Sequence, residues 1–457
     1  MQGSVWGSLK CTALMDKLNK TATADKSLQY NYKGDPDIPI GILGMVDDTL
    51  AISECGNSAI RKNAVVNSFI ETHRLTLSAE KSVVLHYGKE SKCVLPCPTL
   101  KVHNVDMQKK QSVKYLGNML STNGGLSETI DDRRNKGWGK ISTIMAILSE
   151  VDMGVNQLEA GLLMRESLLI SGMLFSAEAW SGITSKQLAR MEVVDTSLLV
   201  KLTGGHSKCP TEFNHLETGT WMLTHHLTYL RLLYHHHILT RDKKETINKI
   251  YQKQKEDNTK GDWFQLLTND FDFIDVQMDE ERIMQTPKSL YKKEIRALVS
   301  KAAFRYYLQK KEKHTKLDKI EYTQLKLQPY LSTKSINNMQ KELLYLLRSK
   351  CHGSKMSFKK LYRNNLKCVL GCMQNEDQLH VFTQCQPLLD KLNNSNSSPY
   401  NHIFGSLPQQ VQLIQEFYKI DQMRKHIIKK HISPGGPDCQ DPCTLEILSS
   451  GAAYTSA

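Results

Sequence analysis

Long apolar runs are absent from this sequence of 457 residues, and none approaches the roughly 18–20 residues that a membrane-spanning helix requires. A charged-then-apolar leader is missing as well, since Met1 is followed directly by Gln2, Gly3 and Ser4. No internal repeat of fixed period is found. These absences argue against a membrane protein and a repeat array, and they predict an intracellular protein, either nuclear or cytoplasmic.

A regular disulfide framework is also missing. The eleven cysteines are scattered along the chain, and their number is odd. In a reducing compartment, closely spaced cysteines indicate metal binding rather than disulfide bonds. Where the cysteines of this chain cluster, they are therefore expected to be metal ligands.

Acidic residues are in deficit. The chain has 47 Asp and Glu residues against 60 Lys and Arg residues, which gives a formal net charge of +13. Such a surplus suits a polyanionic partner, because each neutralised phosphate releases counterions and adds affinity that does not depend on sequence. The charge therefore indicates a nucleic-acid partner, and the alternative is a basic protein whose charge only keeps it in solution.

The chain changes character along its length, from a mixed α+β region to a mainly helical one. Short apolar runs bounded by turn formers predict strands at residues 38–46 and 49–53, a helix at 57–73, and strands at 82–87 and 112–117. From about residue 126 onward, apolar residues recur at helical spacing. The expected helices span residues 128–150, 156–180, 185–203, 220–256, 278–312 and 335–350.

The paired aspartates Asp47 and Asp48 stand at the tip of the first predicted strand-turn-strand. Two adjacent carboxylates repel each other, and a divalent metal relieves this repulsion. Carboxylate oxygens suit Mg²⁺, which also binds substrate phosphates. The alternative is a tight hairpin turn in which aspartate supplies a favourable backbone conformation.

Four short motifs carry a resemblance to a known family. Residues 45–48 (Met-Val-Asp-Asp) resemble the aromatic-x-Asp-Asp box of reverse transcriptases, with methionine in place of the aromatic residue. Residues 2–9, 75–82 and 115–117 resemble three further motifs of these enzymes, and all four follow the family's order and spacing. The chain is thus similar to the reverse transcriptase of a non-LTR retrotransposon, in its carboxy-terminal portion.

The resemblance implies a two-metal nucleotidyl transfer on an RNA template and a DNA primer, in which Asp47 and Asp48 bind Mg²⁺. It places Gln2 and Gly3 in the nucleotide pocket, where glycine lets the backbone approach the ligand closely. Lys81 takes a triphosphate-side or proton-donor role, and the alternative is a solvated lysine. By the same resemblance the primer grip consists of Tyr115, Leu116 and Gly117.

The sequence departs from the family pattern at its beginning. The family uses a further metal-binding aspartate on a strand that precedes the Gln-Gly motif, and this chain starts at that motif. The fingers region that contacts the template is missing too. The expectation is a polymerase that is catalytically incomplete on its own.

Basic and aromatic residues interleave after the fourth motif. Arg133, Arg134 and Lys136 precede Trp138 on a predicted helix that resembles the thumb, which tracks the duplex through its backbone. These three residues are candidate phosphate contacts, and the alternative is a set of solvated helix charges. Trp180, further along, is expected in the core.

Two histidine clusters invite a metal interpretation, at residues 225–226 and 235–237. Neither cluster offers a third ligand at helical spacing. A positively charged or partly buried helix face is therefore expected for both.

Cys368, Cys372, His380 and Cys385 form the pattern C-x3-C-x7-H-x4-C. Three thiolates and one imidazole are a complete tetrahedral ligand set for Zn²⁺. The alternatives are chance clustering and a different ligand pair at residues 351–352, and the C-x3-C pairs at 93–97 and 439–443 stay unassigned. The spacing is similar to the C-terminal knuckle of the site-specific non-LTR retrotransposons with a restriction-like endonuclease, although no nuclease is predicted here. The basic residues that flank the pattern and are expected to contact nucleic acid are Lys359, Lys360, Arg363 and Lys367.

The sequence therefore predicts an α+β chain with a partial polymerase palm, a mainly helical thumb and linker region and a small zinc knuckle. Two alternatives to a polymerase fragment stay open: a non-catalytic protein that binds RNA or DNA, and a decayed reading frame without selected function. The expected segments are half of a palm at 1–120, a thumb and post-thumb region at 121–255, a helical linker at 256–350, the knuckle at 351–390, and a helical then disordered tail at 391–457.

Overall fold

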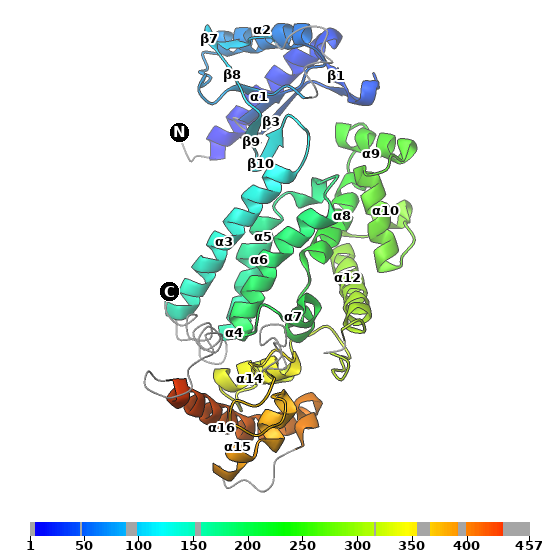
Figure 1. Ribbon diagram of the computed structural model, residues 1–457. Coiled ribbons are helices and arrows are strands. Elements are labelled where there is room, and N and C mark those ends of the chain that lie inside the picture. Colours follow the sequence, from blue (N-terminus) through cyan, green and yellow to red (C-terminus); the bar gives the residue numbers. More distant parts are fainter. Residues whose placement is uncertain are drawn as a thin grey trace. The chain divides into compact units, whose positions relative to one another are not determined.

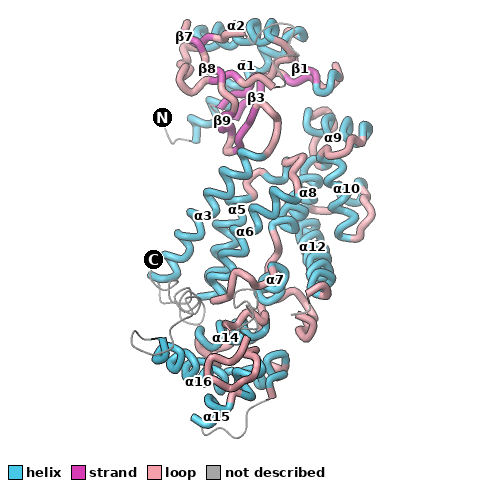
Figure 2. Tube along the Cα trace, in the orientation of Figure 1, coloured by secondary structure: helices cyan, strands magenta, loops and turns pink. Residues whose placement is uncertain are grey.

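The computed structural model describes residues 5–45, 48–87, 98–150, 157–314, 317–353, 366–391 and 399–432 (Figure 1). The described chain is mainly helical, and its named strands all fall between residues 30 and 121 (Figure 2). These strands pair only two by two, so the described part contains no closed sheet. The expected α+β class and the change to a helical pattern near residue 126 are confirmed. No described helix is both long enough and apolar enough to cross a membrane.

The described chain divides into two compact units that are built from interleaved segments. Unit 1 contains residues 1–136, 173–191 and 227–297, and unit 2 contains residues 137–172, 192–226 and 298–457. This division differs from the five consecutive segments that the sequence predicts, because four long helices each contribute residues to both units. These helices are α3 (Ser127–Glu150), α6 (Ser185–Thr203), α8 (Leu223–Leu239) and α12 (Lys288–Lys311).

In unit 1 the first strand-turn-strand lies on two helices. Helix α1 (Val5–Ala24) contacts both strand β3 (Ile42–Met45) and helix α2 (Gly56–Thr72). Strand β4 (Asp48–Ala51) pairs with β3 in antiparallel register. The predicted strands at 38–46 and 49–53 and the helix at 57–73 are therefore present, with shorter strands than expected. A small apolar cluster holds them together and contains Leu18, Ala22, Ile42 and Phe69.

The other strands of unit 1 form four further pairs. Three pairs are antiparallel and one, β5 with β8, is parallel. Since most of these strands have only two residues, the hydrogen bonds between strands contribute little to the stability of unit 1, and packing of its helices contributes more. The pairs are β1 (Tyr30–Asn31) with β2 (Pro39–Ile40), β5 (Val83–Val84) with β8 (Gln108–Lys109), β6 (Lys101–Val102) with β7 (Val105–Asp106), and β9 (Ser112–Tyr115) with β10 (Asn118–Ser121).

Two of the long helices that the sequence predicts are interrupted. The helix expected at 220–256 is divided into α8 and α9 (Thr246–Asp257). The helix expected at 278–312 is divided into α11 (Glu280–Gln285) and α12 by Pro287, which has no backbone N–H to continue a helix. Helix α10 (Trp263–Ile274) completes this helical part of unit 1.

The helix expected at 156–180 changes its type along its length. Helix α4 (Gln157–Met164) continues into a π-helical turn, η5 (Arg165–Ile170), and then into α5 (Ser171–Met173). It ends where Ser176 adopts a left-handed backbone with φ 56°, before the short helix η6 (Ala177–Ala179). Trp180, which follows, is 4% exposed, and the prediction of a core position is confirmed.

The histidine clusters lie on α8 and are mostly buried. His235 and His236 are bonded to Tyr251 Oη and to the Thr286 carbonyl, each at 2.9 Å. His225 packs against the ring of Tyr307, with 5.2 Å between ring centroids. The expected partly buried helix face is therefore present, and its imidazoles contact aromatic rings and hydroxyl or carbonyl groups.

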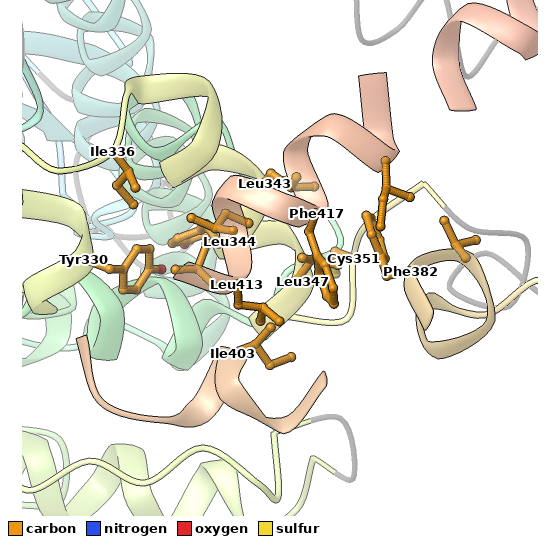
Figure 3. Close-up of a cluster of buried hydrophobic side chains, with 14 of the residues drawn as sticks. Tyr330, Ile336, Leu343, Leu344, Leu347, Cys351, Phe382, Ile403, Leu413 and Phe417 are labelled. Carbon is orange, nitrogen blue, oxygen red and sulfur yellow. The ribbon is translucent and has the colours of Figure 1, made fainter. Parts of the chain in front are cut away.

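The largest described core lies in unit 2, where α13, α14 and α16 meet (Figure 3). Leu344, Leu347, Leu413 and Phe417 are fully buried in it. Burial of an apolar side chain of this size stabilises a fold by about 1.5–3 kcal/mol. The elements that build it are α7 (Thr211–Thr218), α13 (Pro329–Ser332), α14 (Asn338–Arg348), η8 (His380–Gln384), α15 (Gln386–Lys391), η9 (Tyr400–Phe404) and α16 (Leu407–Ile432).

A buried carboxylate, Glu217, organises polar groups inside this core. Arg348 Nη2 donates to Glu217 Oε1 at 2.9 Å. The hydroxyls of Tyr322 and Tyr330 each donate to the same carboxylate at 2.6 Å. A buried charge is tolerated only with such partners, so α7 and α14 are joined by polar as well as apolar contacts.

Candidate functional site

The four residues of the C-x3-C-x7-H-x4-C pattern meet in unit 2, beginning with a short hairpin. Lys367 and Asn375 pair as an antiparallel bridge, and the Glu376 N–H donates to the Leu366 carbonyl at 2.7 Å. The connecting turn places Gly371 at φ 85°, a conformation that favours glycine. Both Cys368 and Cys372 therefore lie in this turn.

The other two ligands come from a helical turn. The Asp377 carboxylate accepts the N–H of His380 at 2.7 Å, just where the π-helical turn η8 begins. Cys385 follows directly at the end of η8. The helical turn faces the hairpin turn, so the four ligand atoms all lie within 4.8 Å of one another.

The distances fit a tetrahedral ion. Cys372 Sγ lies 3.4 Å from both other sulfur atoms and 3.3 Å from His380 Nε2, and Cys368 Sγ lies 3.9 Å from Cys385 Sγ. With Zn–S bonds of about 2.3 Å and a Zn–N bond of about 2.0 Å, tetrahedral geometry requires separations of roughly 3.5–3.8 Å. This Cys3His group can therefore hold a metal ion and is compatible with zinc.

The imidazole is already oriented as a ligand. His380 Nδ1 lies 2.8 Å from Gln374 Oε1, an acceptor that holds the proton on Nδ1. The lone pair is thereby left on Nε2, the atom that faces Cys372. A hydrogen bond from the Cys385 thiol is the main cause that lowers the pKa of Cys368 to about 4, and the same contact raises the pKa of Cys385.

The metal group belongs to the large core of unit 2 and does not form a separate miniature core. Phe382 of η8 stacks on Phe417 of α16, with ring centroids 4.7 Å apart. The Glu376 carboxylate accepts the Val369 N–H at 2.9 Å and Arg424 Nη2 at 2.6 Å. A metal ion at this site would therefore also stabilise the packing of α16. The spacing of the four ligands does not indicate this link to α16.

The residues around the group have other roles. Lys367 Nζ donates to the Met373 carbonyl at 2.7 Å, and Lys359, Lys360 and Arg363 lie outside the described residues. His352 Nε2 is 3.0 Å from Asp421, so residues 351–352 do not replace a ligand of the Cys3His group. The cysteine pairs at 93–97 and 439–443 also lie outside the described residues.

A second group of possible ligands, Glu192, Asp195 and His215, lies in unit 2, and no sequence spacing indicates it. Arg165 donates to both oxygens of Asp195, at 2.6 and 2.5 Å, and the ring of His215 lies 2.9 Å from Glu192. Burial raises the pKa of Glu192 to about 7 and lowers that of His215 to about 3. Both carboxylate oxygens of Asp195 already accept hydrogen bonds from Arg165. We therefore interpret this group as a buried polar network rather than a metal centre.

Of the two predicted polymerase carboxylates, Asp48 begins β4 in unit 1. Met45 is paired with Asp48, whose side chain is exposed, and Asp47 lies outside the described residues together with Gln2 and Gly3. No group of three metal-ligating side chains among the described residues includes Asp48. The expected Mg²⁺ therefore finds no support here and stays a prediction.

The predicted primer grip forms a tight turn between β9 and β10. Tyr115 pairs with Asn118, and Leu116 and Gly117 have φ values of 45° and 83°. Two positive φ values in a two-residue connection are typical of a type I′ hairpin. Burial, and after it the charge of Asp48, raises the pKa of Tyr115, so the hairpin carboxylate acts on this turn.

Arg133 contacts the β9–β10 turn. Its side chain is only 5% exposed, and Nη2 donates to the Gly117 carbonyl at 2.7 Å. The guanidinium also lies over the ring of Phe175, 5.3 Å from its centroid. The predicted contact of Arg133 with phosphate stays a prediction.

The remaining candidates are more exposed. Lys136 forms a salt bridge of 2.6 Å with Asp132, Arg134 is half-buried, and Lys81 lies exposed in a turn. Their predicted contacts with nucleic acid or nucleotide stay predictions. Comparison of the chain with protein-family models and with curated proteins gives no match, so these sites are interpreted from their own residues.

Proposed function

We propose that this chain is a part of a reverse transcriptase of the non-LTR retrotransposon kind, which binds an RNA template and a DNA primer. The observation that carries this proposal is the grouping of the motifs in unit 1. Helix α1, which follows the Gln-Gly motif in sequence, packs on strand β3 of the Asp-Asp hairpin. The charge of Asp48 acts in turn on Tyr115 of the predicted primer grip.

The close fit of α1 to the hairpin supports this grouping. Asn19 Oδ1 accepts the Ile42 N–H at 3.3 Å, and a Cβ on Gly44 would touch Met15 at 3.7 Å. In this arrangement helix α1, which begins within the nucleotide-pocket motif, packs against strand β3 of the carboxylate motif. In two-metal transfer Asp48, with Asp47, would hold Mg²⁺, and the primer 3′-hydroxyl would lose its proton and attack the α-phosphate of the incoming nucleoside triphosphate, which would break the α–β phosphoanhydride bond and release pyrophosphate.

The second candidate function is nucleic-acid binding without catalysis. It is favoured by the Cys3His group, which can hold zinc in unit 2 without any contribution from the Asp-Asp hairpin. The net charge of +13 fits either function. In both cases the partners are RNA and DNA, recognised through their phosphates.

Binding and extension by the purified chain distinguish the two functions. We expect the chain to bind an RNA–DNA primer-template, with an affinity that falls steeply as salt rises. Extension of the primer that is lost in Asp48→Asn and kept in Asp106→Asn, an exposed control carboxylate of unit 1, would establish the polymerase. Binding without extension is the result expected of an incomplete site, and it would favour the second function for the chain alone. Absence of binding at low salt would contradict both.

A further inference from the structure

A cavity of about 190 Å³ lies in unit 2, away from the Cys3His group. It is formed where the ends of α3 and α6 approach α4, α13 and α14. Its lining is mixed, with five apolar side chains and six polar ones, which are Gln157, Lys201, Thr203, Asn338, Lys341 and Glu342. Small-molecule sites combine apolar contacts with polar groups that fix the ligand's orientation, and this lining offers both. The apolar side chains are Met145, Leu148, Leu158, Leu202 and Leu331.

Lys341 is the unusual group in this lining. Its side chain is 5% exposed, and within the described residues its ammonium has no hydrogen bond and no salt bridge. Burial lowers the pKa of Lys341, and the only charge that opposes this effect is Glu159. A buried ammonium without a partner is costly, so an anionic group beside it would be stabilised.

The other buried cations described in unit 2 show what Lys341 lacks. Arg165 is paired with Asp195, Arg348 with Glu217, and Arg424 with Glu376. Each of these three pairs has at least one nitrogen–oxygen distance below 3.0 Å. Among these four buried cations of the described chain, Lys341 is the one that lines the cavity and has no carboxylate partner.

The neighbouring Glu342 also lines the cavity, next to Gly204. Its side chain lies over Gly204, where a Cβ would collide with Glu342 Cγ. Burial raises the pKa of Glu342. The cavity therefore offers a ligand the buried ammonium of Lys341, and the exposed Lys201 and the carboxylate of Glu342 are the other charged groups of its lining.

We propose that this cavity binds a small organic monocarboxylate, with Lys341 Nζ paired to the carboxylate and the apolar wall around the rest of the ligand. A single ammonium neutralises a single negative charge. A phosphate dianion would keep an unpaired charge close to Glu159 and Glu342, so a monocarboxylate suits the site better. The site is independent of the proposed polymerase function, since it uses none of the motif residues of unit 1.

Three probes of the same shape test the proposal on the full chain: benzoate, benzamide and benzylammonium. We expect benzoate to bind with a Kd of about 1 mM or tighter in calorimetry, which is reasonable for a ligand of its size. The neutral and the cationic probe should bind at least about tenfold more weakly, because they lose the charge-assisted hydrogen bond to Lys341. Equal binding of the three probes, or no benzoate binding at about tenfold higher concentration, overturns the proposal.

Two variants locate the site. Lys341→Met should weaken benzoate binding by about tenfold or more, whereas the matched control Lys334→Met removes an exposed lysine and should leave binding unchanged. If Lys341→Met fails to fold, Asn338→Trp serves instead, because an exposed residue of the lining is replaced by a ring that fills the cavity mouth. Unchanged benzoate binding in either folded variant would place the ligand elsewhere and refute the proposal.

Discussion

The Cys3His group and the Asp-Asp hairpin are both predicted metal sites, but they are built differently. The Cys3His ligands all come from residues 368–385, and three of the four are buried. At the hairpin, Asp48 is exposed and its motif partners come from distant segments of unit 1. A site made from one short segment can be inferred from spacing, whereas a site made from several segments depends on how the chain packs.

The two sites also differ in what a metal would do for the fold. At the Cys3His group, ligands and core overlap, because Cys385 is fully buried beside Phe382 and Leu388. At the hairpin, the described carboxylate contributes to no core cluster. We therefore expect metal to stabilise unit 2 strongly and unit 1 hardly at all.

The largest expected effect is the loss of zinc from unit 2. Structural zinc sites contribute on the order of 10 kcal/mol of binding free energy, which becomes folding free energy because the unfolded chain has no preformed site. Cys385→Ser or strong chelation should therefore remove about one zinc per chain, measured by native mass spectrometry. Hydrogen exchange should then rise across η8, α15 and α16.

The matched control for this change is Cys55→Ser. Cys55 is an exposed thiol that caps α2 in unit 1, where serine is an equally good cap. This variant should keep its zinc and its protection. Loss of zinc in Cys55→Ser, or protection of α16 that does not change on chelation, would contradict the role of the Cys3His group.

Glu217→Gln should have the next largest effect and tests whether unit 2 also depends on its buried ion pair. The substitution leaves Arg348 without a compensating charge, although the two tyrosines keep an acceptor. Breaking a buried pair in this way costs about 3–5 kcal/mol. Urea denaturation of the zinc-loaded chain measures it, and Glu321→Gln is an exposed control in the same unit. A loss below about 1 kcal/mol would show that the metal alone determines the stability of unit 2.

The difference between the two sites explains how much the sequence could predict. The spacing of the cysteines and the histidine predicted the Cys3His group, because ligands that are close together in sequence can meet in few arrangements. Helical periodicity placed the helix at 185–203, which α6 matches. It missed the break before α9, at residues 240–245, and the break after α11, at Pro287.

Tertiary contacts account for most of what the sequence could not provide. Arg133 was predicted to contact phosphate from an exposed helix face, but it is buried against Gly117 and Phe175, which lie in other segments of the chain. The unpaired state of Lys341 depends on residues from five helices, and no local pattern indicates it. The link between Glu376 and Arg424 likewise joins two segments that spacing does not relate.

Acid should weaken unit 1 through His235, with an effect of up to about 3 kcal/mol. Burial lowers the pKa of this imidazole to about 4 in the folded chain, against 6.5 when unfolded. Between pH 4 and 6.5 the unfolded state binds a proton that the folded state does not, so stability falls as the pH decreases through this window. Hydrogen exchange of α9 and α10 at pH 4.5 and 7 measures this loss separately from the metal group.

His235→Phe should flatten that pH dependence, since phenylalanine keeps the ring contacts with Tyr251 and Phe271. The control is His426→Gln, an exposed histidine of α16. If His235→Phe keeps the full dependence on pH, the acid sensitivity of unit 1 has another origin.

The smallest effect distinguishes two neighbouring cations of α3. Arg133→Met should cost unit 1 about 2 kcal/mol, because it leaves the Gly117 carbonyl without its donor. The salt dependence of RNA binding should not change, since a buried guanidinium releases no counterion. Lys136→Met should do the reverse: little change in stability, and a salt slope that is smaller by about one phosphate contact. A reduced slope in Arg133→Met would mean that this guanidinium leaves the β9–β10 turn to reach phosphate. In that case the predicted primer grip would be reshaped when nucleic acid binds, and not held in place beforehand by Arg133.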